Sequence, residues 1–195
     1  MTTPNADEQD QAAMERLAKG DDTALETLMN RHAERLFHYL IRVLQNEARA
    51  ADLAEEAFVR VYQNRLKFRP KHRFTTWLYT IATNLARDLQ RYQARHPQLS
   101  LDGNQDGTGA DFYDRLAEPR PDPGEALESV ERSDAVRRAV ATLSEELRVP
   151  LILATYEEKS HAEIAEILRC SPKAVEMRLY RARSELRVLL GKVLA

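Results

Sequence analysis

The stretch CSPKAVEMRLYRAR at residues 170–183 concentrates side chains that could bind a polyanion. A helix turns by about 100° per residue, so Val175, Leu179 and Ala182 share one apolar face. The side chains on the opposite side and its flanks are candidates for contacting DNA: Lys173, Glu176, Met177, Arg178, Tyr180, Arg181 and Arg183. Arginine can bind phosphates or guanine edges, and glutamate can accept a hydrogen bond from cytosine. The alternative is a helical hairpin with a solvated basic face.

A second segment, KFRPKHRFTTWLYTIATNLARDLQRY at residues 67–92, interleaves cations with aromatic rings. This pattern suits single-stranded nucleic acid, because cations follow the backbone while rings stack on bases for about 1–3 kcal/mol each. The candidate contacts are Lys71, His72, Arg73, Phe74, Thr76, Trp77, Asn84 and Arg87. The alternative makes Phe74 and Trp77 ordinary core aromatics.

A third segment, DLAEEAFVRVY at residues 52–62, has an acidic outer face. Leu53, Ala57 and Val61 share its apolar stripe. The side chains expected outside this stripe are Asp52, Glu55, Glu56 and Phe58. Acids repel phosphates, so this face favours a protein partner over DNA. The alternative is simple solvation of the acids, with Phe58 packed against a neighbour.

Helical periodicity must position all three segments. It predicts helices at 10–19, 23–45, 48–64 and 75–95, and again at 125–142, 144–157, 160–168 and 172–190. The fold class is therefore all-α, with two small helical domains at 10–95 and 125–195. Residues 1–9 are expected to be a disordered tail. Residues 96–124, rich in proline, glycine and acids, are expected to be a flexible linker.

The last two expected helices form a helix-turn-helix pattern. Ser160 can cap the first, with Glu163 completing a capping box. Ser171 can cap the second, and Pro172 fits its first turn, where a missing N–H costs nothing. A three-residue turn joins them, as in the pair that places a recognition helix in the major groove.

Charge and composition restrict the function further. The net charge is only −2, yet residues 60–95 are strongly basic, 102–134 strongly acidic and 169–192 basic again. Two separate basic regions favour two contacts with a polyanion. The single cysteine excludes an internal disulfide, and no apolar run approaches the ~20 residues of a membrane span. The polar N-terminus lacks a signal-peptide core, which predicts a cytoplasmic protein.

The residues do not favour an enzyme. The five histidines and Cys170 have no metal-ligand spacing, and there is no glycine-rich phosphate loop. We therefore expect no catalytic residues, metal or cofactor.

In order and spacing, four segments resemble the bacterial sigma factors of the sigma-70 family. They are DLAEEAFVRVY, FRPKHRFTTWLYTIATNLARD, LSEELRVPLILATYEEKSHAEIAEIL and CSPKAVEMRLYRARSEL. The absence of extra N-terminal regions resembles the short extracytoplasmic-function (ECF) type. The resemblance covers about residues 10–95 and 125–190.

The resemblance implies a non-enzymatic protein that binds core RNA polymerase and directs it to promoters. Region 2, at 10–95, would bind the β′ clamp helices through Asp52, Glu55, Glu56 and Phe58. The 70–74 loop and the helix with Thr76, Trp77, Asn84 and Arg87 would read and open the −10 element. Region 4, at 125–195, would contact the β flap and read the −35 element through Lys173 to Arg183. An anti-sigma factor is also expected as a partner.

Two other readings stay open. A stand-alone helix-turn-helix regulator would explain residues 125–190 but not the basic and aromatic segment at 67–92. A helical adaptor would bind only proteins. Some relatives carry arginine and serine where this chain has Glu176 and Met177, so their −35 preference does not transfer.

Overall fold

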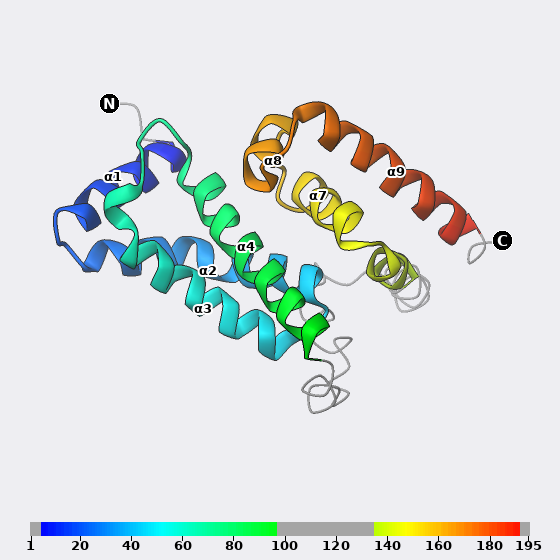
Figure 1. Cartoon of the computed structure of the whole chain (residues 1–195). Helices are drawn as coiled ribbons and strands as arrows, with labels where there is room; N and C mark the ends of the chain where they lie inside the picture. The colour runs from blue at the N-terminus through cyan, green and yellow to red at the C-terminus, as the bar shows by residue number, and fades with distance from the viewer. Residues whose placement is uncertain (1–4, 97–134, 192–195) are drawn as a thin grey trace, which may run out of the picture.

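The computed structural model describes residues 5–96 and 135–191, and within these ranges it is entirely helical. The N-terminal half contains α1 (Ala6–Ala18), α2 (Thr23–Leu44), α3 (Glu47–Gln63), a short 3₁₀ turn (Arg65–Lys67) and α4 (Phe74–Arg95). The C-terminal half contains a helical segment at 135–142, α7 (Glu145–Thr155), α8 (His161–Leu168) and α9 (Pro172–Gly191). Two helical halves were expected, and the all-α class is confirmed (Figure 1).

The observed helix boundaries follow local capping chemistry. Ser160 and Glu163 form the expected capping box, and the Ser171 hydroxyl accepts from the Ala174 N–H at 3.2 Å. Gly20 follows α1 with a φ of 94°, a conformation that glycine adopts without a steric penalty. Asp21, rather than the neighbouring Asp22, accepts from the Thr23 N–H at 3.1 Å and caps α2.

The expected disordered tail at residues 1–9 is wrong for its second half, because α1 begins at Ala6. Asn5 accepts from the Glu8 N–H, and the Glu8 carboxylate accepts from the Asn5 N–H, which completes a capping box. Asp10 is buried in α1 and binds Arg31 and His32 of α2. These contacts fix the first turns of α1 against the neighbouring helix.

Residues 1–4, 97–134 and 192–195 are not described. The expected acidic linker at 96–124 therefore lies, beyond its first residue, outside the described residues, as does the first part of the helix expected at 125–142.

The N-terminal core lies where α2, α3 and α4 meet. Tyr39 of α2 is fully buried, and its hydroxyl lies 2.7 Å from the Thr83 hydroxyl of α4. Its ring meets the Tyr79 ring edge-on, at 4.9 Å between centroids. This polar contact inside an apolar core fixes the register of α4 against α2.

The two halves pack against each other. Helix α7 lies between α2 and α9, and α8 lies along α4 (Figure 1). Buried side chains of both halves form one continuous cluster. No described helix is long and apolar enough to cross a membrane.

A pair of identical substitutions tests which apolar side chains carry the N-terminal core. Leu40 is 0% exposed in α2 and Leu66 is 77% exposed. Leu40→Ala should lower the free energy of unfolding by about 2–5 kcal/mol, because a cavity replaces packed methyl groups. Leu66→Ala should change it by less than about 0.5 kcal/mol. Urea unfolding followed by circular dichroism measures both, and equal effects would contradict this placement of the core.

Candidate nucleic-acid interfaces

Helix α9 presents one face to the core and the opposite face to solvent. Val175, Leu179 and Ala182 are buried as expected. Six of the seven predicted contact residues are exposed: Lys173, Glu176, Met177, Tyr180, Arg181 and Arg183. Lys173 and Glu176 pair at 2.9 Å, which neutralises part of the charge at the start of the helix. The exposed face carries side chains of the types that can contact phosphates and base edges in a major groove.

Arg178 differs from the other predicted contacts because it is directed toward the protein. Its guanidinium lies 2.9 Å from the Glu146 carboxylate of α7 and donates to the Cys170 sulfur at 3.5 Å. In this arrangement Arg178 ties α9 to α7 and to the turn before α9. Its contacts orient the helix rather than extend its exposed face.

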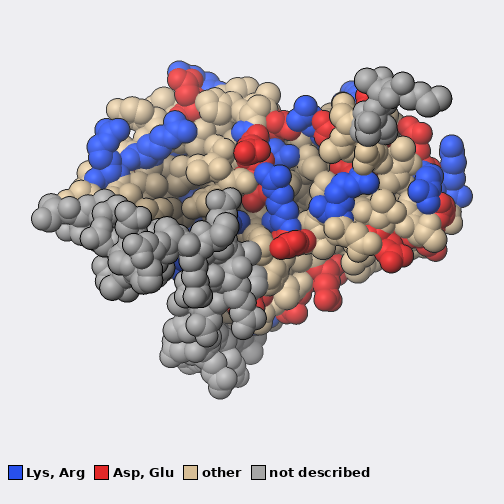
Figure 2. Space-filling view, turned by 180° about the vertical axis from the view of Figure 1, so that it is seen from behind, with Lys and Arg blue, Asp and Glu red and all other residues tan. Residues whose placement is uncertain are grey.

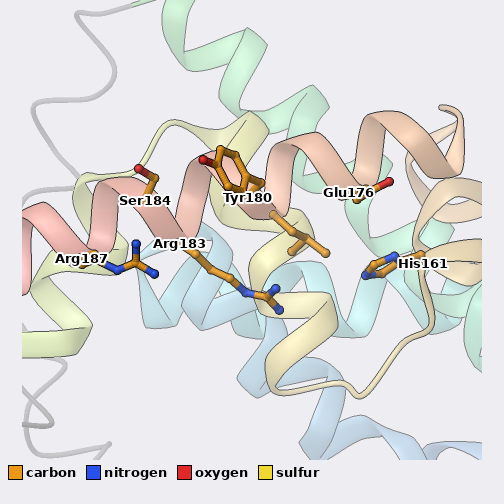
Figure 3. Close-up of a pocket in the computed structure, with 7 residues that line it drawn as sticks. His161, Glu176, Tyr180, Arg183, Ser184 and Arg187 are labelled. Carbon is orange, nitrogen blue, oxygen red and sulfur yellow. The ribbon is translucent and has the colours of Figure 1, made fainter.

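A pocket of about 250 Å³ lies along one flank of α9 (Figure 3). Arg183 and Arg187, one helical turn apart, line it together with His161 at the start of α8. Glu176, Leu179, Tyr180 and Ser184 complete the lining. Neither His161 nor Arg187 is among the contacts predicted from the sequence. The sequence signal that could have indicated His161 was its position directly after Ser160, the residue that caps α8.

The cations around α4 have acidic partners. His72 Nδ1 lies 2.7 Å from the Glu166 carboxylate of α8. Arg73 lies 3.3 Å from Glu163 of α8 and 3.0 Å from Asp7 of α1, and Arg87 lies 3.2 Å from Glu145 of α7. Lys71 is exposed. Three predicted nucleic-acid contacts, His72, Arg73 and Arg87, are thus paired with carboxylates of the C-terminal half.

Two of the predicted −10 contacts are core residues in this structure. Phe74 is 2% exposed, and the rings of His32, Phe68 and Trp77 surround it. Thr76 is also 2% exposed. The expectation that they are available on the surface is wrong, because the first turn of α4 is inserted among α1, α2 and the 65–68 turn. Trp77 and Asn84 are half-buried.

A buried acid, Glu157, lies between the two halves. Its side chain is 1% exposed and follows α7 in the chain. One carboxylate oxygen accepts from Arg35 Nε at 2.8 Å and from the Tyr79 hydroxyl. The other lies 4.0 Å from Arg42 Nη1. This cluster was not predicted from the sequence, because its members lie far apart along the chain.

The pKa values of two side chains next to Glu157 are shifted. Burial and then the Glu157 charge raise the pKa of Tyr79 far above the ordinary tyrosine value. Burial lowers the pKa of Lys159, whose amine donates to the Thr75 hydroxyl at 2.8 Å and lies 5.3 Å from the Tyr79 ring centre. The Tyr79 hydroxyl therefore stays a proton donor to Glu157 at neutral pH.

The acidic face of α3 is only partly as expected. Asp52 and Glu55 are exposed, and Glu56 pairs with Arg60 at 2.5 Å. Phe58 is 2% exposed, so its expected place on the outer face is wrong. Its ring completes the core between α3 and its neighbours. Val59 is the exposed apolar residue beside the acids instead.

Charges of both signs meet across the middle of the molecule. On the face drawn in Figure 2, Lys and Arg do not form one continuous basic field, because acidic side chains lie among them. Among residues 5–96 and 135–191, no group of three His, Cys, Asp or Glu side chains could hold a metal ion.

Comparison with known proteins identifies both halves. Residues 28–96 match the model of sigma-70 region 2, and residues 133–186 match that of sigma-70 region 4. The chain is 33% identical over 175 residues to the ECF RNA polymerase sigma factor SigW of Bacillus subtilis, covering 89% of this chain and 92% of SigW. It is 31% identical over 176 residues to the ECF RNA polymerase sigma-E factor of Escherichia coli (strain K12), covering 89% and 90%.

Solved structures share the arrangement of helices. CnrH in complex with the cytosolic domain of CnrY superposes with a TM-score of 0.68 at 25% identity, covering 94% of this chain and 98% of CnrH. RpoE of Bartonella quintana, in complex with the anti-sigma factor NepR, gives a TM-score of 0.65 at 22% identity, covering 85% and 96%.

The buried tyrosines give a test of the packing between α2, α4 and the C-terminal half. Burial raises the pKa of both Tyr39 and Tyr79, whereas in the unfolded chain both ionise at their ordinary values near 10. Their contribution to stability is thus present below pH ~10 and is lost as pH rises beyond it. In a spectrophotometric titration of the seven tyrosines, these two should ionise only as helical circular dichroism disappears.

Tyr39→Phe and Tyr79→Phe should each reduce the part of the tyrosine ionisation that accompanies the loss of helical circular dichroism. If every tyrosine ionised while the chain stayed helical, the buried placement of both rings would be contradicted.

Proposed function

The chain belongs to the ECF sigma factors of the sigma-70 family, which direct RNA polymerase to promoters, and we propose that its two halves read separate promoter elements. Sigma factors are non-enzymatic transcription initiation factors. The observation that carries the proposal is the solvent-facing side of α9, opposite a face that is fixed in the core. We place region 2 at residues 6–96 and region 4 at about 135–191.

Helix α9 reads the −35 element in this proposal. Its exposed side chains, from Lys173 to Arg183, are of the types that contact phosphates and base edges in a major groove. Arg178 holds the helix against Glu146 and so positions the reading face. Arg183, Arg187 and His161 line the flanking pocket, where a DNA backbone phosphate would lie beside the helix.

The N-terminal half opens and reads the −10 element. Lys71, His72, Arg73 and Arg87 supply cations for the strand backbone, and Trp77 and Asn84 lie on the same helix for contacts with bases. Extruding a base costs a few kcal/mol, which stacking and hydrogen bonds in this region offset. We leave Phe74 and Thr76 out of the contact set, because both are core residues.

The acidic face of α3 meets the β′ clamp helices of the polymerase. Asp52 and Glu55 provide charge, and Val59 provides the apolar contact that the sequence analysis had assigned to Phe58. Region 4 contacts the β flap. With the polymerase holding both halves, neither needs to bind DNA tightly alone.

Two further features follow from this proposal. The protein acts where RNA polymerase and DNA are, in the cytoplasm. The second feature is a partner protein, an anti-sigma factor, as NepR is for RpoE in their complex. It would restrain the chain by covering the surfaces that polymerase needs.

Transcription from purified components tests the function. The chain, core RNA polymerase and a library of promoters randomised at two windows should yield transcripts enriched for one −35 and one −10 sequence. Glu176→Arg should change the −35 preference and leave the −10 preference unaltered, because a glutamate that accepts from cytosine is replaced by a donor. Discrimination at the affected base should shift about tenfold or more, consistent with ~1–3 kcal/mol per contact.

Glu185→Arg is the matched control. It makes the same change on the same helix at an exposed position on the opposite side of the helix from Glu176. No transcript above that of core enzyme alone would contradict the sigma function and favour a regulator that binds duplex DNA by itself. An unchanged −35 profile for Glu176→Arg would remove Glu176 from the reading face.

Charge reversal on α3 tests the polymerase contact. Asp52→Lys combined with Glu55→Lys should raise the Kd for core polymerase about tenfold or more, because like charges across an interface are strongly unfavourable. The control, Glu15→Lys with Glu26→Lys, changes the net charge equally at exposed sites on α1 and α2. Fluorescence titration of core enzyme measures both, and equal affinities would rule out this face as the clamp contact.

A further inference from the structure

We propose that Arg35, Arg42 and Tyr79 form an anion site that takes a backbone phosphate of promoter DNA, and that Glu157 occupies this site when DNA is absent. The inference rests on the proposed function, because it needs the N-terminal half to bind DNA. It adds residues of α2 that neither the sequence patterns nor the family comparison assigns to DNA. It also makes the closed arrangement of the two halves a competitor of DNA.

The site is built for an anion with several acceptor oxygens. Arg35 and Arg42 lie seven residues apart, on the same face of α2. The Tyr79 hydroxyl reaches the same carboxylate from α4. Charge-assisted bonds from arginine suit carboxylate and phosphate alike, because both present oxygens that match the guanidinium fork.

Glu157 enters this site from the loop between α7 and α8, and its neighbours reinforce the contact. Arg35 also donates to the Tyr156 carbonyl at 3.2 Å, and the Arg42 guanidinium lies 4.3 Å from the centre of the Tyr156 ring. Lys159 donates to the Thr75 hydroxyl. The loop is therefore one of the segments that hold the C-terminal half on α2 and α4.

The same arrangement continues along α4. Three carboxylates of the C-terminal half pair with cations of the N-terminal half: Glu166 with His72, Glu163 with Arg73 and Glu145 with Arg87. Those three cations belong to the proposed −10 surface. A phosphate can take the donor edge that a carboxylate occupies only by displacing that carboxylate, so the closed arrangement and DNA compete for these cations.

The energetics favour exchange over simple separation. A buried carboxylate is tolerated only while paired, and removing its partners is strongly unfavourable. If the C-terminal half moves away, Glu157 regains water, and Arg35 and Arg42 lose their counter-charge. A DNA phosphate restores it. Opening of the two halves and DNA binding are thus thermodynamically linked, and each stabilises the other.

The test measures binding of the full chain to a fluorescein-labelled oligo(dT) of about 20 nucleotides by fluorescence anisotropy at ~50 mM salt, where phosphate contacts dominate. Glu157→Gln keeps the shape of the side chain and removes the competing charge, so it should tighten binding about tenfold. Glu158→Gln removes one charge from the adjacent exposed residue and should change binding less than about twofold. Adding Arg35→Gln to Glu157→Gln should abolish the gain.

Equal binding by Glu157→Gln and Glu158→Gln would overturn the competition. A gain that survives Arg35→Gln would overturn the phosphate site. Should Glu157→Gln fail to fold by circular dichroism, Glu166→Gln replaces it, since it releases His72 at an exposed edge and should also tighten binding. No gain over Glu158→Gln would then overturn the competition.

The outcome is separable from that of the sigma function. If the chain supports transcription but Glu157→Gln does not change oligo(dT) binding, only the inference about the anion site is contradicted. Tighter oligo(dT) binding in a chain that never supports transcription would sink the sigma function and leave the competition standing.

Discussion

The contact of Glu157 with Arg35 and Tyr79 sets the relation between the two halves of this sigma factor. It places a carboxylate, 1% exposed, between α2, α4 and the C-terminal helices. Such burial is tolerated only with several donors in place, so the geometry around Glu157 is tightly constrained. The neighbouring pairs along α4 are more exposed and individually weak, and they add to the apolar contact between the halves.

This constraint gives the charge pattern of the chain a structural meaning. The net charge is nearly balanced, yet the basic surface of the N-terminal half and the acids of α7, α8 and their connecting loop lie against each other. Under the proposed function, a promoter competes with these acids for His72, Arg73 and Arg87. The reading face of α9 is not involved, since it lies on the solvent side of the C-terminal half. The two proposed promoter contacts therefore differ in how freely DNA reaches them.

Much of the fold could be predicted from local chemistry. The capping box at Ser160 and Glu163, the glycine after α1 and the apolar stripe of α9 all act within a few residues, so the sequence reveals them. The capping box at Asn5 and Glu8 was equally visible and was overlooked. The period of a helix shows which face is apolar but not which neighbour covers its edges. For that reason Phe58 and Phe74 were predicted as surface contacts, with a position in the core as the alternative.

Glu157 could not be found in this way, because its partners Arg35 and Tyr79 lie 122 and 78 residues away along the chain.

The central claim is that the halves close through this contact and separate on the promoter. Single-molecule energy transfer between dyes at Gln63 and Glu185, with Cys170 replaced by serine, measures it directly. The account predicts one short distance in the free chain and a longer one with core polymerase and promoter DNA. The same distance in both states would contradict it.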